Sequence, residues 1–334
     1  PASFGAALQY FTGSKEHNVR LREIAVRKGF KINEYGIFRV KTGRRLGGRE
    51  EAEIYQALGL PYIPPELRED AGEIDAALQH RLPRLVEPSD LRGDFHIHTT
   101  WSDGSDRLEE MAAAGASRGY RYLAICDHSR SLKVAHGMSI ARLRQQMMRI
   151  RALNRRGGRC RLLMGAEVDI LSDGSMDYPD RVLQELDFVV GSIHSGFTQD
   201  VATITRRILR AMRNPSVTMI AHPTGRLMGQ REAYGVDLEA VFKAARETGT
   251  ALEINAYPKR LDLCDTAARR AGRLGAMLAV STDSHSLDQL DQMIFGLGVA
   301  RRAWIEPRQL LNTCSRASLL AWIATKRKRP TPSG

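Results

Sequence analysis

After Leu91 the chain alternates short apolar runs with longer stretches of helical periodicity. Seven runs rich in apolar and β-branched residues predict strands at 92–97, 121–126, 161–169, 187–193, 217–222, 251–255 and 277–282. Helices are predicted near 106–118, 140–156, 179–185, 200–213, 237–248 and 264–275, with two more after 288. Strands that alternate with helices build parallel sheets, so we expect an α/β domain of seven repeated units over residues 91–334. Periodicity alone leaves open whether these units form a barrel or an open sheet.

The first 65 residues follow a different pattern. Ser14 is placed to cap a helix that runs to Lys28, and two short strands are expected at 30–33 and 36–40. A second helix is expected at 49–58, before a cluster of prolines that ends the unit. We therefore expect a small α+β module at 1–65 and a linker at 66–90 with one or two helical turns.

Composition changes this picture through charge. The 334 residues, 43% of them hydrophobic, suffice for about two domains, and the net charge is +12. Residues 1–49 carry 11 Lys and Arg against 3 acids, and residues 137–166 contain eight arginines and no acid. Such clusters suit phosphate backbones, although a single basic stretch is often only a solvated face.

Cysteine usage and hydropathy indicate the compartment. The four cysteines form no CxxC pair, which disfavours a disulfide framework or a thiolate zinc site and fits a reducing cytoplasm. No apolar run approaches 18 residues, so we expect no membrane span and no membrane partner. The chain begins with Pro1, without a signal peptide, and we expect it to be part of a longer protein.

Six of the nine histidines fall at the C-terminal ends of predicted strands, together with three carboxylates. In α/β folds these strand ends meet at one face, where sites are assembled from several strands. So much buried charge must be paired or metal-bound, which excludes simple core packing. The predicted metal ligands, which are also the predicted catalytic residues, are His96, His98, Asp103, His128, Glu167, His194, His222, Asp283 and His285.

These ligands predict the chemistry. Nitrogen and oxygen donors suit Mn²⁺, Zn²⁺ or iron, and Glu167 is the best candidate for a bridge between two or three ions. Metal ions a few ångströms apart activate water and clamp a phosphate, so phosphoester hydrolysis is the leading prediction. Four residues in loops after these strands are candidates for binding substrate phosphates, with ordinary surface residues as the alternative: Lys133, Ser195, Arg226 and Arg260.

Two strings of residues resemble known families. The string from Gly5 to Ser14, followed by Asn18, Arg22 and Asn33-Glu34-Tyr35, resembles the thumb of family X DNA polymerases. The resemblance implies that Tyr10, Asn18 and Arg22 contact the incoming nucleotide or the template. It also implies that palm and N-terminal polymerase domains precede this segment in the full-length protein, so the segment alone should not polymerise.

The second string resembles the PHP domain. It comprises His96-x-His98, Asp103, Asp127-His128, Gly165-Ala166-Glu167, Ser192-Ile193-His194, Ala221-His222-Pro223 and Asp283-x-His285. This resemblance implies a distorted (β/α)7 barrel that holds three divalent metal ions. One ion would take His96, His98, Glu167 and Asp283, a second Glu167, His194 and His222, and a third Asp103, His128 and His285.

Together the two resemblances imply the C-terminal part of a bacterial family X DNA polymerase. The implied activity is metal-dependent 3′–5′ exonuclease and 3′-end processing on gapped or recessed DNA, in a cytoplasmic repair enzyme that associates with the nucleoid. Two alternatives remain: a small-molecule phosphatase of the histidinol-phosphate type, which would need neither the thumb nor the basic charge, and a non-catalytic DNA-binding module.

Overall fold

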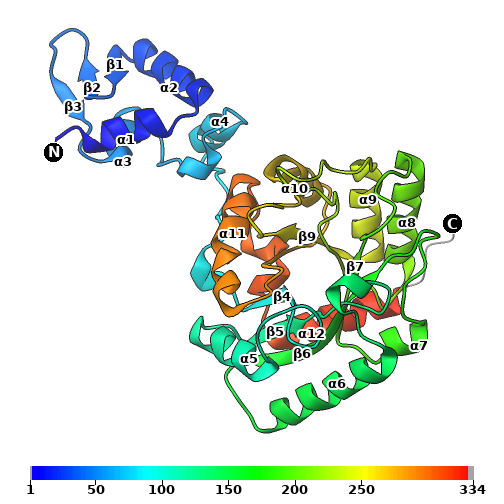
Figure 1. Cartoon of the computed structure of the whole chain (residues 1–334). Coiled ribbons are helices and arrows are strands. Elements are labelled where there is room, and N and C mark those ends of the chain that lie inside the picture. The colour runs from blue at the N-terminus through cyan, green and yellow to red at the C-terminus, as the bar shows by residue number, and fades with distance from the viewer. Residues whose placement is uncertain (1, 330–334) are drawn as a thin grey trace. The chain divides into compact units, whose positions relative to one another are not determined.

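A computed structural model describes residues 2–329, which divide into two compact units between Arg84 and Leu85 (Figure 1). The first unit combines helices α1 (Phe4–Thr12), α2 (Lys15–Arg27), α3 (Glu51–Ala57) and α4 (Glu73–Leu78) with a three-stranded antiparallel sheet of β1 (Phe30–Asn33), β2 (Gly36–Arg39) and β3 (Arg45–Gly47). The α+β prediction is confirmed, while α1 and β3 were not predicted.

The first unit extends past the predicted boundary at residue 65. Two buried ion pairs cause this. The Arg68 guanidinium lies 2.6 Å from Glu51 of α3, and Glu73 of α4 lies 2.6 Å from Nδ1 of His17 in α2. Because buried charges require such partners, the segment from Arg68 to α4 packs as part of the unit.

The second unit contains seven parallel strands in sequence order. They are β4 (Gly93–Ile97), β5 (Tyr122–Ile125), β6 (Arg161–Asp169), β7 (Phe188–Ser192), β8 (Met219–Ile220), β9 (Ala251–Asn255) and β10 (Leu278–Ser281). The first and last strands approach each other through a bridge between Ile97 and Ser284, where His98 N donates to Ser284 O over 2.8 Å. The predicted distorted (β/α)7 barrel is therefore confirmed.

Helices surround the barrel (Figure 1). They are α5 (Leu108–Ser117), α6 (Ile140–Arg155), α7 (Asp180–Leu183), α8 (Val201–Arg213), α9 (Leu238–Thr248), α10 (Asp265–Arg273), α11 (Met293–Arg302) and α12 (Arg316–Lys328). Within residues 2–329, no helix is both long and apolar enough to cross a membrane.

The barrel interior is packed with side chains. Phe95 stacks on Phe188 with ring centres 5.0 Å apart, and Tyr122 lies 5.6 Å from Phe95. Leu319 and Ile323 of α12 belong to the same buried cluster. Because this apolar cluster fills the inside of the strands, polar side chains collect at their C-terminal ends.

Candidate metal centre

All nine predicted ligands converge at the C-terminal ends of the strands. His96 lies within β4 and Glu167 within β6, whereas the others lie in the loops that follow five of the strands. Each loop is short at this point, so strand register fixes the position of the ligand. The exposed fraction of the side chain is 0% for His96 and His98, 1% for Glu167 and at most 33%, at His285.

Glu167 occupies the middle of the cluster. Its Oε1 lies 3.3 Å from Nε2 of His194 and 3.0 Å from Nε2 of His222. Its Oε2 lies 3.3 Å from Nε2 of His96 and 2.9 Å from Nδ1 of His128. The two oxygens therefore face different groups of imidazoles, as a bridging carboxylate would.

Two further carboxylates each face two imidazoles closely, with a third further away: His98 at 3.8 Å from Asp103 and His285 at 4.0 Å from Asp283. Asp283 Oδ1 lies 3.2 Å from His98 Nε2 and 3.6 Å from His96 Nε2. Asp103 Oδ2 lies 3.5 Å from the Nε2 atom of His128 and 3.4 Å from that of His285. The cluster thus has three foci, each built on one carboxylate.

These separations fit shared metal ions. Two donors bound at about 2.1 Å in tetrahedral geometry lie about 3.4 Å apart, close to the spacings at Asp103 and Asp283. Several buried imidazole nitrogens have no hydrogen-bond partner among residues 2–329. They include Nε2 of His96, both nitrogens of His98 and Nδ1 of His128. Buried polar atoms are rarely left unsatisfied, so these nitrogens indicate binding of cations at the cluster.

The electrostatics of the cluster agree with this fit. Burial lowers the pKa of His98 to about 3, helped by the neighbouring imidazoles. At His128 burial is outweighed by Glu167 and Asp103, which raise the pKa to about 10. Burial alone would raise the pKa of Glu167, but nearby imidazoles, His194 first, hold it well below its ordinary value. The carboxylates thus create a negative interior that divalent cations would neutralise.

Two buried carboxylates that sequence reasoning missed orient the imidazoles. Glu253 of β9 lies 2.8 Å from Nδ1 of His96, and Asp169 of β6 lies 2.6 Å from Nδ1 of His194. A carboxylate only accepts, so each Nδ1 is the donor and each Nε2 lone pair is directed toward the centre. The sequence did offer a signal for Glu253, because it is the charged residue inside the otherwise apolar strand Ala251–Asn255.

The backbone at the ligands is also constrained. His222 has a φ of 29° and Asp283 a φ of 54°, a region that non-glycine residues seldom adopt. Asp127 fixes the loop after β4 by accepting from Thr99 N over 2.8 Å and from Ser102 Oγ over 2.6 Å. The fold therefore sets the ligand positions rigidly, as a preorganised site requires.

Comparisons with known proteins agree with both units. Residues 7–69 match the DNA polymerase beta thumb family, and residues 94–257 match the PHP domain family. The "DNA polymerase/3'-5' exonuclease PolX" of Bacillus subtilis is 44% identical over 96% of this chain. The chain therefore combines a polymerase thumb and a PHP domain, and over both it resembles this family X polymerase. It spans 56% of the length of the Bacillus protein.

Other relatives match a smaller share of the chain. A "Probable phosphatase" of Syntrophotalea carbinolica is 28% identical over 66% of this chain and 90% of its own length. Among solved structures, the putative histidinol phosphatase of Listeria monocytogenes aligns with 60% of this chain and 97% of its own, with 15% identity and a TM-score of 0.47.

Of the predicted substrate residues, only Arg260 reaches the metal centre of the PHP domain. Its Nε lies 3.4 Å from Asp283 Oδ2, and its buried Nη1 has no hydrogen-bond partner within the described residues. Arg226 instead holds the loop that carries Arg260, because its guanidinium donates to the carbonyls of Arg260, over 2.6 Å, and of Leu261. Substrate contact by Arg226 would therefore require these bonds to break.

The other two candidates lie further from the chemistry. Lys133 and Ser195 are exposed, and no interaction within residues 2–329 joins either side chain to the cluster. The Ser195 carbonyl accepts from Arg207 over 3.0 Å. Their contact with substrate stays a prediction.

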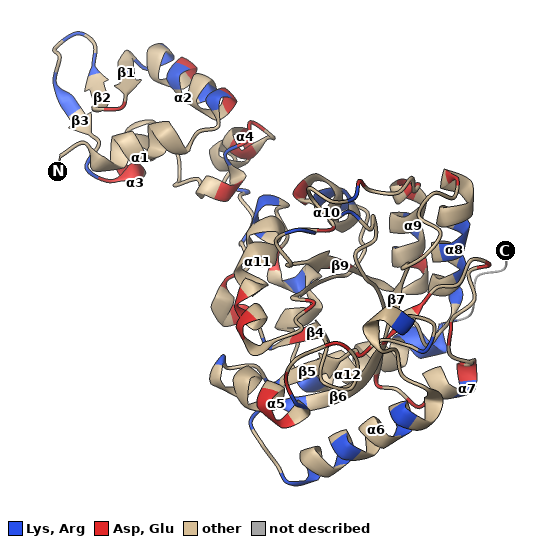
Figure 2. Ribbon diagram, viewed as in Figure 1, with Lys and Arg blue, Asp and Glu red and all other residues tan. Residues whose placement is uncertain are grey.

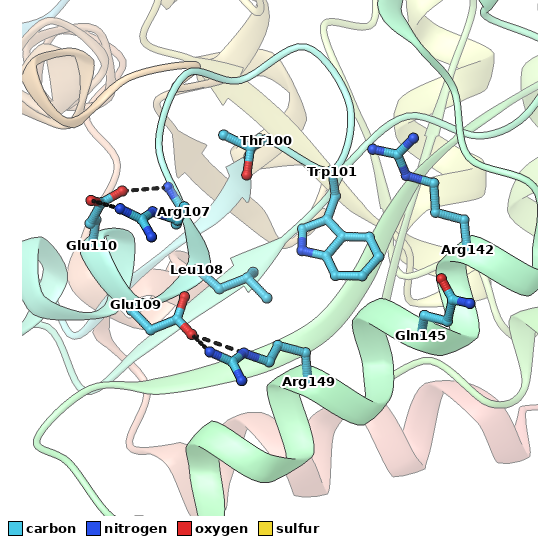
Figure 3. A pocket seen from close by; sticks show the side chains of 9 residues that line it. All are labelled: Thr100, Trp101, Arg107, Leu108, Glu109, Glu110, Arg142, Gln145 and Arg149. Carbon is cyan, nitrogen blue, oxygen red and sulfur yellow. Dashed lines mark hydrogen bonds and ion pairs between the residues drawn. The ribbon is translucent and has the colours of Figure 1, made fainter.

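A groove of about 900 Å³ is formed by α5, α6 and the loop that carries Asp103. Trp101 lies within it, with the Arg142 guanidinium 5.8 Å from the ring centre, and Arg149 on α6 pairs with Glu109 (Figure 3). An aromatic ring beside an arginine is a suitable surface for an unpaired base and its phosphate.

The predicted thumb residues form one cluster. Asn18 is buried, donates to the Tyr10 carbonyl over 2.8 Å and accepts from Gln9 over 2.6 Å, so it ties α1 to α2. Arg22 lies beside the Tyr10 ring at 5.7 Å and is exposed. Nucleotide or template contact at these three positions stays a prediction.

Proposed function

We propose that this chain catalyses metal-dependent hydrolysis of DNA phosphodiesters, as the 3′–5′ exonuclease and 3′-end-processing part of a repair polymerase. The observation that carries the proposal is the complete cluster of nine nitrogen- and oxygen-donor side chains around Glu167. The Bacillus relative, which matches both units, is named an exonuclease as well as a polymerase.

A small-molecule phosphatase is the second candidate, because relatives named probable phosphatases match part of this chain over 90–91% of their own length. They match 58–71% of the chain, whereas the Bacillus polymerase matches 96%. The thumb and the net charge of +12 favour DNA over a small metabolite. The intact ligand set argues against a module that only binds DNA.

Three divalent ions, Mn²⁺, Zn²⁺ or iron, fit the three foci. One would be held by His96, His98, Glu167 and Asp283, one by Glu167, His194 and His222, and one by Asp103, His128 and His285. Such ions, when bound, supply an activated water and neutralise charge on the scissile phosphate.

The protein itself would position the substrate. The free Nη1 of Arg260, beside Asp283, is placed to donate to a phosphate oxygen. The Trp101 ring would stack the unpaired base at the 3′ end, and Arg142 would pair with a neighbouring phosphate. The preferred substrate would be a gapped or recessed 3′ end, delivered by upstream palm and N-terminal domains in the cytoplasm, at the nucleoid.

A direct test supplies the chain with Mn²⁺ and a duplex that has a recessed 3′ end and a 5′ label, and follows shortening on a gel. A parallel reaction measures phosphate release from histidinol phosphate. Asp283→Asn and His128→Ala should abolish manganese-dependent shortening. His80→Asn, which alters an exposed histidine of the other unit, is the matched control and should retain it.

Three other results would contradict the proposed exonuclease function. Release of phosphate from histidinol phosphate with no shortening of DNA would establish the phosphatase. If the protein contains metal and binds DNA tightly but hydrolyses neither substrate, it is a DNA-binding module. Full activity of Asp283→Asn would remove the site assignment.

A further inference from the structure

The end of the barrel opposite the metal centre carries a row of arginines. Arg92 directly precedes β4, Arg121 directly precedes β5, and Arg161 begins β6. Their backbones are bonded in sequence, since Arg121 N donates to Arg92 O over 2.6 Å and Arg161 N donates to Arg121 O over 2.9 Å. Neighbouring strands lie about 4.8 Å apart, so sheet register sets the spacing of the three side chains.

A groove of about 570 Å³ collects these side chains, and we call it the arginine groove. It is lined by Arg92, Arg121, Gly158, Arg159, Arg161, Thr313, Ser315 and Arg316. All five arginines are exposed, and no carboxylate lines the groove. Arg316 is the first residue of α12, where free backbone N–H groups add positive potential.

The arginines of this groove differ from those elsewhere on the domain. Arg144 lies 2.6 Å from Glu185, and Arg149 pairs with Glu109. None of the five groove arginines forms an ion pair with any residue between 2 and 329. A face that only needed solvation would not hold five like charges around one hollow, because their mutual repulsion costs free energy.

The positive surface continues along the C-terminal end of α6. Two adjoining hollows of about 440 and 350 Å³ share Arg161 and Arg316 with the arginine groove and add Arg151, Arg155 and Arg156. Figure 2 shows repeated basic positions along α6. The carboxylates of these hollows, Asp187 and Glu109, already accept bonds, from Met164 N over 2.9 Å and from Arg149.

We propose that the arginine groove binds the phosphodiester backbone of DNA, as an anchoring site separate from the metal centre. Guanidinium groups bind phosphate oxygens in pairs, and a row of them suits a ligand with regularly repeated phosphates. The arginines of the groove would contact only the DNA backbone, so binding would not depend on the DNA sequence. This inference extends the proposed function, because an anchored strand would stay bound while its end is trimmed.

The distance between the two sites makes the proposal measurable. Glu167 lies six residues after Arg161 on the same strand, so about 20 Å of extended chain separates groove and metal centre. DNA rises about 3.4 Å per nucleotide, and a ligand shorter than about six nucleotides cannot touch both sites. The groove should therefore affect long substrates and leave short ones unchanged.

The experiment compares two triple variants of the full chain in EDTA. Arg121→Gln, Arg161→Gln and Arg316→Gln together remove three of the five positive charges of the groove. Arg206→Gln, Arg213→Gln and Lys243→Gln remove the same number of charges from exposed positions on α8 and α9. Anisotropy of a labelled duplex of about three helical turns gives Kd at several salt concentrations. We expect the groove variant to bind about 10- to 100-fold more weakly, with a salt slope reduced by about 2–3, and the control to change little.

In a separate assay with Mn²⁺ and no EDTA, the three proteins should hydrolyse a nitrophenyl ester of thymidine monophosphate equally, because this substrate cannot span both sites. Equal rates also report that the variants are folded. Arg121→Glu alone is a second, milder disruption and should weaken duplex binding too. Equal loss of affinity in the groove and control variants, or no loss in either, would overturn the proposal. Because binding is measured without metal, absence of nuclease activity would refute the proposed function and leave the groove intact.

Discussion

Replacing Glu253 with glutamine should disable one corner of the metal centre without changing its shape. Glu253 is fully buried in β9, and its two oxygens accept from three donors, the third being Asn255 Nδ2 at 3.1 Å from Oε2. Its Oε1 lies 2.8 Å from His96 Nδ1, and its Oε2 lies 2.6 Å from the backbone N of His222. A glutamine amide offers one acceptor and one donor, so it can serve only one of these partners.

Both orientations of that glutamine are unfavourable. If its oxygen accepts from His222 N, its NH₂ group faces His96 and forces the imidazole proton onto Nε2, the atom directed at Glu167. If its oxygen accepts from His96, its NH₂ group opposes a backbone N–H that cannot turn away. An unsatisfied buried donor costs about 1–3 kcal/mol, and loss of an orienting partner typically weakens metal binding by about 10- to 100-fold.

Asp169→Asn is the matched control. Asp169 also holds an imidazole, with Oδ1 2.6 Å from His194 Nδ1, but its other oxygen accepts from the hydroxyl of Ser131. A hydroxyl can rotate and accept a bond from the new NH₂ group, so the asparagine can keep His194 in the same tautomer. We therefore expect Asp169→Asn to weaken metal binding less than Glu253→Gln.

The assay is competition for Mn²⁺ or Zn²⁺ against a chromophoric chelator, with circular dichroism to confirm folding. Glu253→Gln should show one class of site weakened by about 10- to 100-fold and a matching rise in the Mn²⁺ concentration needed for hydrolysis. Wild-type affinity in a folded Glu253→Gln protein, or a larger loss in Asp169→Asn, would refute the tautomer argument.

Three further predictions concern phosphate binding and stability. Arg260→Ala should lower kcat/KM on DNA by about tenfold or more at unchanged Tm, because a charged hydrogen bond contributes roughly 1.5–3 kcal/mol. Arg226→Ala, which frees the loop that carries Arg260, should lower Tm as well. Calorimetry of both variants separates the two effects. Burial lowers the pKa of Lys326 from 10.5 to about 8, so as the pH rises the folded state releases this proton before the unfolded state does. The free energy of unfolding should therefore rise by up to about 3 kcal/mol between the two pKa values. Urea titrations should show that rise in the wild type and not in Lys326→Met. Phe95→Ala should remove about 3–5 kcal/mol of unfolding free energy by opening a cavity beside Phe188, measured by the same titrations.

The fold was predictable from the sequence wherever the pattern of apolar residues reflects which faces of an element are buried. The barrel strands are apolar runs because both of their faces are buried, and each predicted run contains the strand that forms. Helix α1 was missed because its first N–H groups have no side-chain cap. They are satisfied by tertiary contacts, since Gly5 N donates to Arg49 O and Ala6 N to Gly48 O, each over 3.0 Å. Such partners, more than forty residues away, leave no local signal.

The site was predictable for a related reason. Residues that follow the strands of a parallel barrel all lie at the same end of it, so the position of each ligand after its strand was enough to predict that the ligands meet. What each carboxylate does depends on pairs that sequence does not show. Glu253 and Glu167 are both glutamates within buried strands. Glu253 accepts from a backbone N–H and orients an imidazole, whereas Glu167 faces five imidazoles. The distinction lies in which neighbours are donors, and only the assembled barrel determines that.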